Sequence, residues 1–227
     1  MPKRRKSRRY QSKMSKLFAW NFKKYLFYLG VLAALIAGFA ISCTITAPRN
    51  IDNSCDIFNE YPKWYLYTVL ARDRWDISIG TQLAFVRQES RFAQDAVPPR
   101  TRLLWFIPWS RKSSAYGYPQ AVNETWDWYQ RDSGRIGANR DDFADAVDFI
   151  GWYMNKSRER LKLGKEKIYG HYLAYHEGHS GYHRKSYLQK KWLPDVAREV
   201  AKQAALYDKQ LKLCEDDLRR PRWWWPF

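Results

Sequence analysis

The chain has 227 residues, a length that allows one ordinary domain with extensions and excludes a peptide too small for a hydrophobic core. Lys and Arg number 40 against 23 Asp and Glu, so the net charge is +17, and aromatic residues make up 17% of the chain. This composition suits an anionic partner such as nucleic acid, lipid head groups or an acidic polymer, without choosing among them.

The N-terminus has the pattern of an export signal or membrane anchor. Residues 1–24 form a basic n-region with ten Lys or Arg and no acidic residue. Residues 25–42, "YLFYLGVLAALIAGFAIS", follow as an uncharged hydrophobic segment. Because Lys and Arg precede this segment, we expect its first end to stay in the cytoplasm and the rest of the chain to be exported. Met1 and Met14 are both candidate starts.

The hydrophobic segment ends at Cys43, and "FAISC" resembles a bacterial lipobox. The resemblance implies cleavage before Cys43 and lipidation of that cysteine, so that acyl chains hold the protein on a membrane. Thr44 after the cysteine favours the outer membrane over the inner one. The alternative is an uncleaved N-terminal helix as the anchor, with an incidental Cys43. In either case we expect the protein on the periplasmic side of the cell envelope, with residues 43–54 as a tether.

Residues 55–214 have the hydrophobic periodicity of an α-rich domain, without an alternating strand pattern. Residues 94–118 are expected to form a Pro-rich loop. Residues 215–227 are a basic, Trp-rich tail with the composition of an interfacial membrane peptide. The predicted helices span 61–75, 78–91, 120–131, 141–160, 165–175 and 185–214, the last with a bend at Pro194.

Cys55 and Cys214 lie at the two ends of this predicted domain. If Cys43 is lipidated, they remain as an even pair. In an oxidising periplasm, a disulfide between them would close a loop of 159 residues. Two unpaired thiols are the alternative.

One carboxylate lies in an unusual position. In "LAFVRQESRF" (83–92), Glu89 follows Val86 by three residues and Phe85 by four, so it lies on the apolar face of a predicted helix. Charged groups avoid such positions unless they are paired or functional. Glu89 is therefore a surface group, an ion-pair partner, or a catalytic acid whose pKa is raised by apolar surroundings.

Three short motifs occur in order along the chain: "ES" at 89–90, "GYPQ" at 117–120 and "AYHEG" at 174–178. Together they resemble the lytic transglycosylases, lysozyme-like enzymes that cleave peptidoglycan. That family shows Glu-Ser, Gly-Leu-Met-Gln and Ala-Tyr-Asn-x-Gly at these places. "DDFADAVDFIGWYM" (141–154) resembles the family's helix between the last two motifs. The resemblance covers roughly residues 60–185 and implies an all-α, lysozyme-like fold.

The resemblance also implies a mechanism with Glu89 as the sole catalytic residue. Glu89 would protonate the β-1,4 bond between N-acetylmuramic acid (MurNAc) and N-acetylglucosamine (GlcNAc). It would then accept the proton of the muramyl 6-hydroxyl, which closes a 1,6-anhydro ring. No cofactor is required, and the expected partner is the peptidoglycan glycan strand.

Carried over by position, the remaining motif residues would bind substrate around the acid. Tyr175 would reach toward the acid and orient its carboxyl. The other residues expected to contact substrate are Ser90, Gly117, Tyr118, Gln120, His176 and Glu177.

Two departures from the family pattern keep other functions open. Tyr118-Pro119 replaces Leu-Met, and His176-Glu177 replaces Asn-x. Glu177 adds a second carboxylate, which leaves a hydrolytic muramidase as one alternative. A non-catalytic scaffold that binds peptidoglycan through a lysozyme-like cleft is another.

Two further features have weaker interpretations. The segment 98–112, "PPRTRLLWFIPWSRK", is a candidate contact for glycan, lipid or an envelope protein partner, or a loop that packs on its own domain. The chain also has four histidines close together, at His171, His176, His179 and His183. They fall one residue short of a His-Glu-x-x-His motif, so we expect no metal site.

Because we expect export, we expect no nucleic-acid partner. A cytoplasmic nucleic-acid binder is the third alternative.

Overall fold

The computed structural model describes residues 24, 25, 27–32, 45–103, 107–111 and 113–220. They belong to two compact units, Met1–Ile45 and Thr46–Phe227. In the first unit, residues 24, 25 and 27–32 are helical and Ile45 is not, and all of these residues are exposed. Within these described ranges, no helix is both long enough and apolar enough to cross a membrane. Cys43, most of residues 25–42 and residues 221–227 lie outside the described ranges. The lipid anchor, the alternative helix anchor and the role of the tail therefore stay predictions, as do the domain boundaries.

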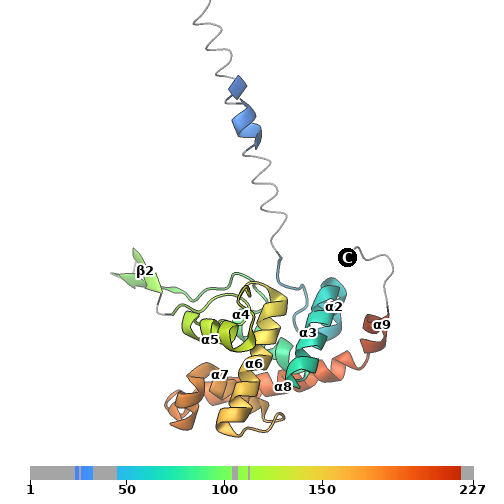
Figure 1. Ribbon diagram of the computed structural model, residues 1–227, viewed down its shortest axis with the longest axis vertical. Helices are drawn as coiled ribbons and strands as arrows, with labels where there is room; N and C mark the ends of the chain where they lie inside the picture. The colour runs from blue at the N-terminus through green and yellow to red at the C-terminus, as the bar shows by residue number, and fades with distance from the viewer. Residues whose placement is uncertain (1–23, 26, 33–44, 104–106, 112, 221–227) are drawn as a thin grey trace, which may run out of the picture. The chain divides into compact units, whose positions relative to one another are not determined.

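The second unit is built mainly from helices, which confirms the predicted fold class (Figure 1). In chain order its elements are α2 (Ser54–Glu60), α3 (Pro62–Trp75), α4 (Ile79–Ser90), β1 (Arg100–Leu103), β2 (Ile107–Arg111), α5 (Asn123–Ser133), α6 (Phe143–Leu161), α7 (Ile168–His183), the 3-10 helix η1 (Ser186–Gln189), α8 (Leu193–Leu211) and α9 (Glu215–Arg219).

Several details differ from the sequence-based expectation, among them that α7 extends past residue 175 to His183 and that α9 lies in the predicted tail. The predicted loop at 94–118 contains an antiparallel hairpin of β1 and β2, which projects away from the helices in Figure 1. The short helix α2 was not predicted. The predicted helix at 185–214 is divided into η1 and α8. Pro194 lies in the first turn of α8 and not at a bend. Proline fits there because backbone N–H groups of a first turn make no hydrogen bond within the helix.

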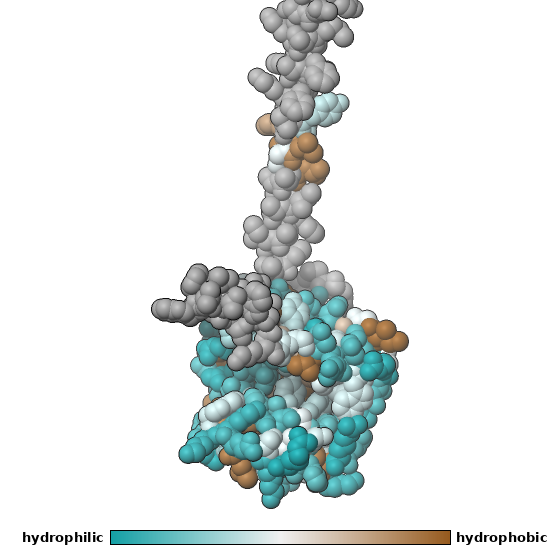
Figure 2. All heavy atoms as spheres, turned by 90° about the vertical axis from the view of Figure 1, so that its left-hand side faces the viewer, coloured by the Kyte–Doolittle hydropathy of each residue, from teal (hydrophilic) through white to brown (hydrophobic). Residues whose placement is uncertain are grey.

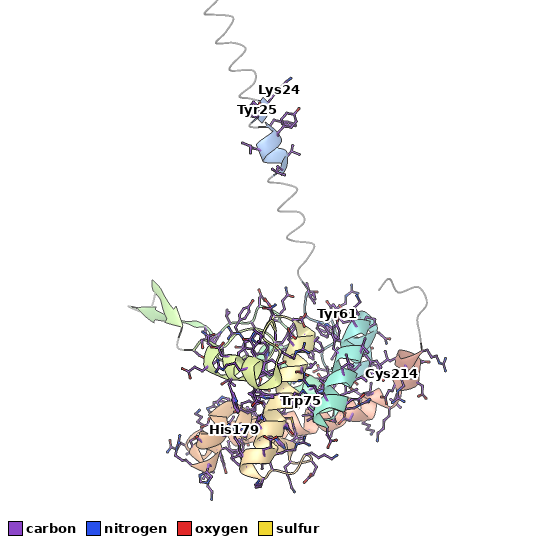
Figure 3. The ribbon with its side chains drawn as sticks, viewed as in Figure 1. Lys24, Tyr25, Tyr61, Trp75, His179 and Cys214 are labelled. Atoms are coloured by element: carbon purple, nitrogen blue, oxygen red, sulfur yellow. A yellow bond between two sulfur atoms is a disulfide. The ribbon has the colours of Figure 1, made fainter. Side chains whose placement is uncertain are left out.

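Helix α6 lies in the middle of the unit and packs on α3, α4, α5 and α7 (Figure 1). Its residues from Phe143 to Met154 are almost all buried, as expected for a helix with neighbours on every side. Gly151 allows α3 to approach closely. A Cβ at this position would lie 2.6 Å from the indole of Trp75, which is labelled in Figure 3.

Helix α4 carries Glu89 near its C-terminal end. Its N-terminus is fixed by the N-cap residue Ser78, whose side chain accepts a hydrogen bond from the Thr81 amide at 3.1 Å. Helix α8 packs closely against α4, and Asp208 accepts a hydrogen bond from the Gly80 amide at 2.7 Å. Because residues 79–86 are all buried, α4 is held as a rigid element.

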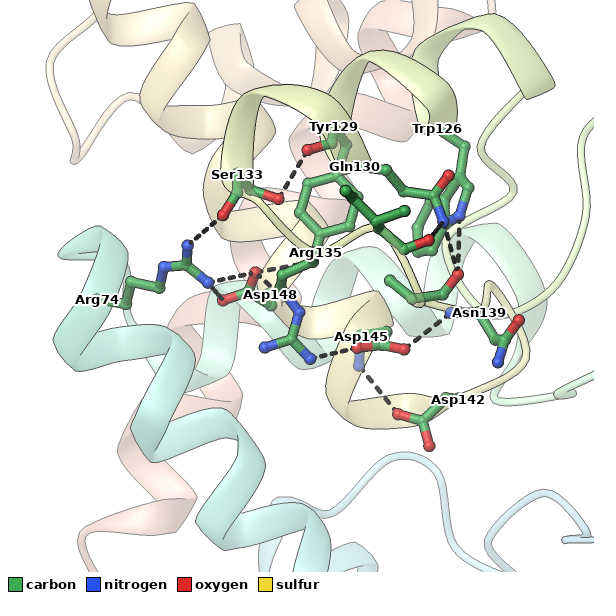
Figure 4. A network of polar contacts seen from close by, with 12 residues as sticks. Arg74, Trp126, Tyr129, Gln130, Ser133, Arg135, Asn139, Asp142, Asp145 and Asp148 are labelled. Carbon is green, nitrogen blue, oxygen red and sulfur yellow. Dashed lines mark hydrogen bonds and ion pairs between the residues drawn. The ribbon is translucent and has the colours of Figure 1, made fainter.

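A buried polar network joins α3, α5 and α6 (Figure 4). Asp148 of α6 accepts hydrogen bonds from Trp75 Nε1 and the Tyr129 hydroxyl, both at 2.8 Å, and pairs with Arg74 at 3.2 Å. A buried carboxylate needs such donors to offset its lost hydration. One turn earlier, Asp145 accepts from Asn139 N at 2.8 Å and pairs with Arg135, so the segment between α5 and α6 is fixed as well.

Cys55 and Cys214 form a disulfide, which confirms the predicted pair. The bond joins α2 to the turn between α8 and α9, where Cys214 is labelled in Figure 3. In the chain-entropy model, closing a loop of 159 residues lowers the entropy of the unfolded chain and stabilises the fold by about 4–5 kcal/mol.

The face shown in Figure 2 is mostly hydrophilic, with hydrophobic residues in small separate patches.

Candidate active site

A cavity of about 400 Å³ brings the three sequence motifs together. Glu89 enters it from α4, Gln120 from the turn before α5, and the "AYHEG" motif from α7. Helix α6 adds two aromatic side chains to the wall. The lining residues are Glu89, Ser113, Ala115, Gln120, Ala121, Val122, Thr125, Phe149, Tyr153, Tyr175, His176, Glu177 and Gly178.

A larger hollow of about 950 Å³ lies elsewhere, between the start of α4, residues 162–170 and α8. It contains none of the motif residues. Two of the acidic and basic groups that line it, Asp76 and Lys165, form an ion pair at 2.9 Å. We therefore place the candidate chemistry in the smaller cavity, which contains a carboxyl group in unusual surroundings.

The backbone ends α4 directly after the Glu89–Ser90 pair. Arg91 and Phe92 follow with positive φ values of 52° and 64°, a conformation that is costly for residues other than glycine. Phe92 is fully buried and stacks on Trp64 with ring centroids 5.9 Å apart, so core packing holds this turn in place. Glu89 is thereby fixed in the last turn of a rigid helix.

The Glu89 carboxyl lies in apolar surroundings. Its Oε1 is buried and has no hydrogen-bond partner among the residues that the structure describes. Phe85, one turn earlier, packs against the rings of Tyr172 and Tyr175 at centroid distances of 5.4 and 5.2 Å. Burial raises the pKa of Glu89 to about 7, although a hydrogen bond from Tyr172 acts in the opposite direction. The carboxyl can therefore hold a proton near neutral pH.

Tyr172, rather than Tyr175, is the tyrosine that hydrogen-bonds to Glu89, which corrects the expected arrangement. The Tyr175 hydroxyl donates to the carbonyl of Pro119 at 2.6 Å and so ties α7 to the second motif. Tyr172 lies outside the three motifs. Its spacing of three residues from Tyr175 puts both side chains on one helix face, and this signal could have identified it.

Gln120 and Gly117 close the base of the segment that contains the β1–β2 hairpin. The Gln120 side-chain amide donates to the carbonyls of Ala96 and Gly117 at 2.8 and 2.9 Å. The Gly117 amide also donates to Ala96 O, at 2.9 Å. Gln120 thus lines the cavity and also fixes the position of its floor.

Arg140, which the sequence did not reveal as a site residue, clamps the same wall. Its guanidinium donates to the carbonyls of Ser114 and Ala121 at 3.0 and 2.8 Å. Its own carbonyl accepts from the Tyr118 amide at 3.0 Å. Gly117 has a φ of 74°, and a Cβ there would lie 2.1 Å from Arg140 O, so glycine is required for this contact.

Ser90 and Tyr118 lie behind the cavity wall and do not line it. The Ser90 hydroxyl donates to Val86 O at 3.1 Å inside α4. Tyr118 is fully buried, with its ring perpendicular to those of Trp64 and Phe143. Both residues have supporting positions, and Gly117 is likewise absent from the lining. The substrate contacts that the motifs predict for these three residues stay predictions.

His176 and Glu177 line the cavity as parts of an ion-pair cluster. The Glu177 side chain is 5% exposed and accepts from Lys190 Nζ at 2.5 Å, from His176 Nδ1 at 2.9 Å and from the Ser186 hydroxyl. Burial alone would raise the pKa of Glu177, but these hydrogen bonds lower it to about 2. The cavity therefore contains one carboxyl that retains its proton and one that is ionised.

Two of the other histidines, His171 and His179, have structural contacts. His171 is fully buried and bonds through Nε2 to Gly164 O at 3.0 Å. His179, labelled in Figure 3, bonds to the Ser157 hydroxyl and stacks on Tyr153. Over the described residues, no group of three or more His, Cys, Asp or Glu side chains is placed to hold a metal ion.

Residues 31–214 match the family model described as "Transglycosylase SLT domain". This chain belongs to that family. Membership implies transglycosylase chemistry that cleaves glycosidic bonds, and SLT domains act on peptidoglycan in the cell envelope. No curated protein and no solved structure gives a match to the chain. The match covers all three motifs that meet in the cavity.

The close approach of Gly117 to Arg140 in this SLT domain predicts a large effect of Gly117→Ala. Gly134 provides a matched control, because its φ is 77° and no atom lies within 4 Å of an added Cβ. We expect Gly134→Ala to lower the free energy of unfolding by about 1 kcal/mol, and Gly117→Ala by about 2–3 kcal/mol more. Urea unfolding measures both. Equal losses would contradict the proposed clamp at the cavity floor.

Proposed function

We propose that the protein is a membrane-tethered lytic transglycosylase of the periplasm that cleaves the MurNAc–GlcNAc bond of peptidoglycan and forms 1,6-anhydroMurNAc. The single observation that carries this proposal is the Glu89 carboxyl. It lines the cavity, its buried Oε1 has no hydrogen-bond partner in the described part of the chain, and its pKa is raised to about 7. A carboxyl in this state can donate a proton to a glycosidic oxygen.

The reaction requires one group that acts first as an acid and then as a base. In the first step Glu89 donates its proton to the leaving oxygen while positive charge develops on the muramyl ring. In the second step the resulting carboxylate accepts the proton of the muramyl 6-hydroxyl, whose oxygen closes the anhydro ring. The proton returns to Glu89, so the enzyme ends the cycle in its starting state.

The state of Glu177 favours this route over hydrolysis. A hydrolase of the inverting type needs a second carboxylate that activates water. Both oxygens of Glu177 already accept hydrogen bonds, and its pKa of about 2 makes it a weak base. We infer that Glu177 supports the cavity wall and supplies negative charge without taking a proton during the reaction. The scaffold alternative is less favoured, because a binding protein has no need for a buried, protonated carboxyl.

Product analysis tests the proposal most simply. The full-length chain, incubated with purified peptidoglycan, should release muropeptides that end in 1,6-anhydroMurNAc. Glu89→Gln should lower this rate by at least about 10²-fold, since the amide can neither donate nor accept the proton. Glu199→Gln, a change of an exposed glutamate on α8, is the matched control and should retain activity. Reducing-end products would identify a hydrolase, and the absence of products from every variant would support the scaffold.

The hydrogen bond from Tyr172 predicts a shift in the pH dependence of the rate. The acid form of Glu89 is lost as the pH rises through its pKa of about 7, so activity should fall above that pH. Because the Tyr172 hydrogen bond lowers the pKa of Glu89, Tyr172→Phe should move this alkaline limb to higher pH. Tyr175→Phe, which loses only a bond to Pro119 O, should leave the limb in place. A limb that stays fixed or moves to lower pH in Tyr172→Phe would contradict the assignment.

A further inference from the structure

The segment Arg184–Trp192 packs against His176 and Glu177, two residues that line the candidate cavity, and does not itself line it. Three contacts tie it to residues that line the cavity: the Ser186 hydroxyl donates to Glu177, Lys190 Nζ lies 2.5 Å from Glu177 Oε1, and the Trp192 ring packs edge-on against His176 at 5.2 Å. These contacts hold η1 and the start of α8 against the cavity wall. We refer to Arg184–Trp192 as the basic edge.

The basic edge carries an unbalanced positive charge. No acidic residue occurs between Glu177 and Asp195. Lys190 is paired with Glu177, whereas Arg184, Lys185 and Lys191 are exposed and have no ion pair within the described part of the chain. Lys191 lies between two residues that contact the cavity wall. Uncompensated cations at the mouth of a cavity attract an anionic ligand and raise its local concentration.

The basic edge also presents apolar surface to solvent. Trp192 is 53% exposed and Leu188 is 63% exposed, although both belong to a segment that is anchored on the core by buried Leu193. An indole that packs on His176 and leaves half of its surface free can cover an extended ligand. A ligand for this edge therefore combines negative charge with apolar or flat groups.

We propose that the basic edge binds the acidic stem peptide of peptidoglycan and so holds the strand beside Glu89. This proposal rests on the proposed function, because the stem peptide is attached to the muramyl sugar whose bond would lie in the cavity. The carboxylates of the stem match Lys185 and Lys191 in charge. Anionic lipid head groups share that charge, but the contacts of this edge with His176 and Glu177 favour a ligand that continues from the cavity.

Binding measurements can test the basic edge without cleavage. The full-length chain carrying Glu89→Gln is mixed with intact peptidoglycan, or with glycan strands from which an amidase has removed the stem peptides, and bound protein is measured by sedimentation. Adding Lys185→Glu and Lys191→Glu should weaken binding to intact peptidoglycan about tenfold and leave binding to stripped strands unchanged. High salt should reduce the difference, because both side chains are exposed.

A matched control keeps the net charge equal. Lys209→Glu with Lys212→Glu changes two exposed lysines near the end of α8, away from the cavity lining, and should not alter the preference for intact peptidoglycan. Thermal unfolding verifies that each variant is folded. Equal loss on both substrates, no loss on either, or the same loss in the control would overturn the proposal, and unchanged binding would make anionic lipid the next ligand to examine. The wild-type protein can also release no anhydro product and still prefer intact peptidoglycan to stripped strands. In that case the proposed reaction is wrong, and the proposal that the basic edge binds the stem peptide is retained.

Discussion

The burial of the Glu89 carboxyl is the constraint on which the rest of the site depends. A carboxyl group in water loses its proton well below neutral pH, and only apolar surroundings without a nearby cation keep the proton in place. Here Phe85, Tyr172 and Tyr175 supply those surroundings. The left-handed turn after Ser90 ends the helix beside the cavity, so the carboxyl is both shielded and able to reach a ligand.

The walls of the cavity are built to keep this arrangement rigid. Arg140 and Gln120 fix the floor through backbone carbonyls, and the network around Asp148 holds the elements behind it. Glu177 is ion-paired with Lys190 and stays ionised, so a second carboxylate lies in the cavity without competing for protons. Rigid positioning of an acid by supporting hydrogen bonds is a general requirement of efficient proton transfer.

Sequence reasoning predicted the features that depend on periodicity and motif order. The helix that carries Glu89, the disulfide and the α-rich fold follow from spacing, cysteine number and hydrophobic pattern. The contact of Tyr172 with the acid could not be predicted in this way, because it depends on how α7 packs against α4. The clamp by Arg140 depends on backbone carbonyls, which are the same in every sequence. The β1–β2 hairpin was missed because its strands are short and lack alternation.

The most direct test is to titrate the Glu89 carboxyl itself. Carbon-13 NMR of the glutamate side-chain carboxyls, recorded as a function of pH, reports the protonation of each group. The Glu89 signal is identified by its absence from the spectrum of Glu89→Gln. We expect a midpoint near pH 7, because burial stabilises the neutral form. A midpoint near the value of 4.5 expected for an unperturbed glutamate would contradict it.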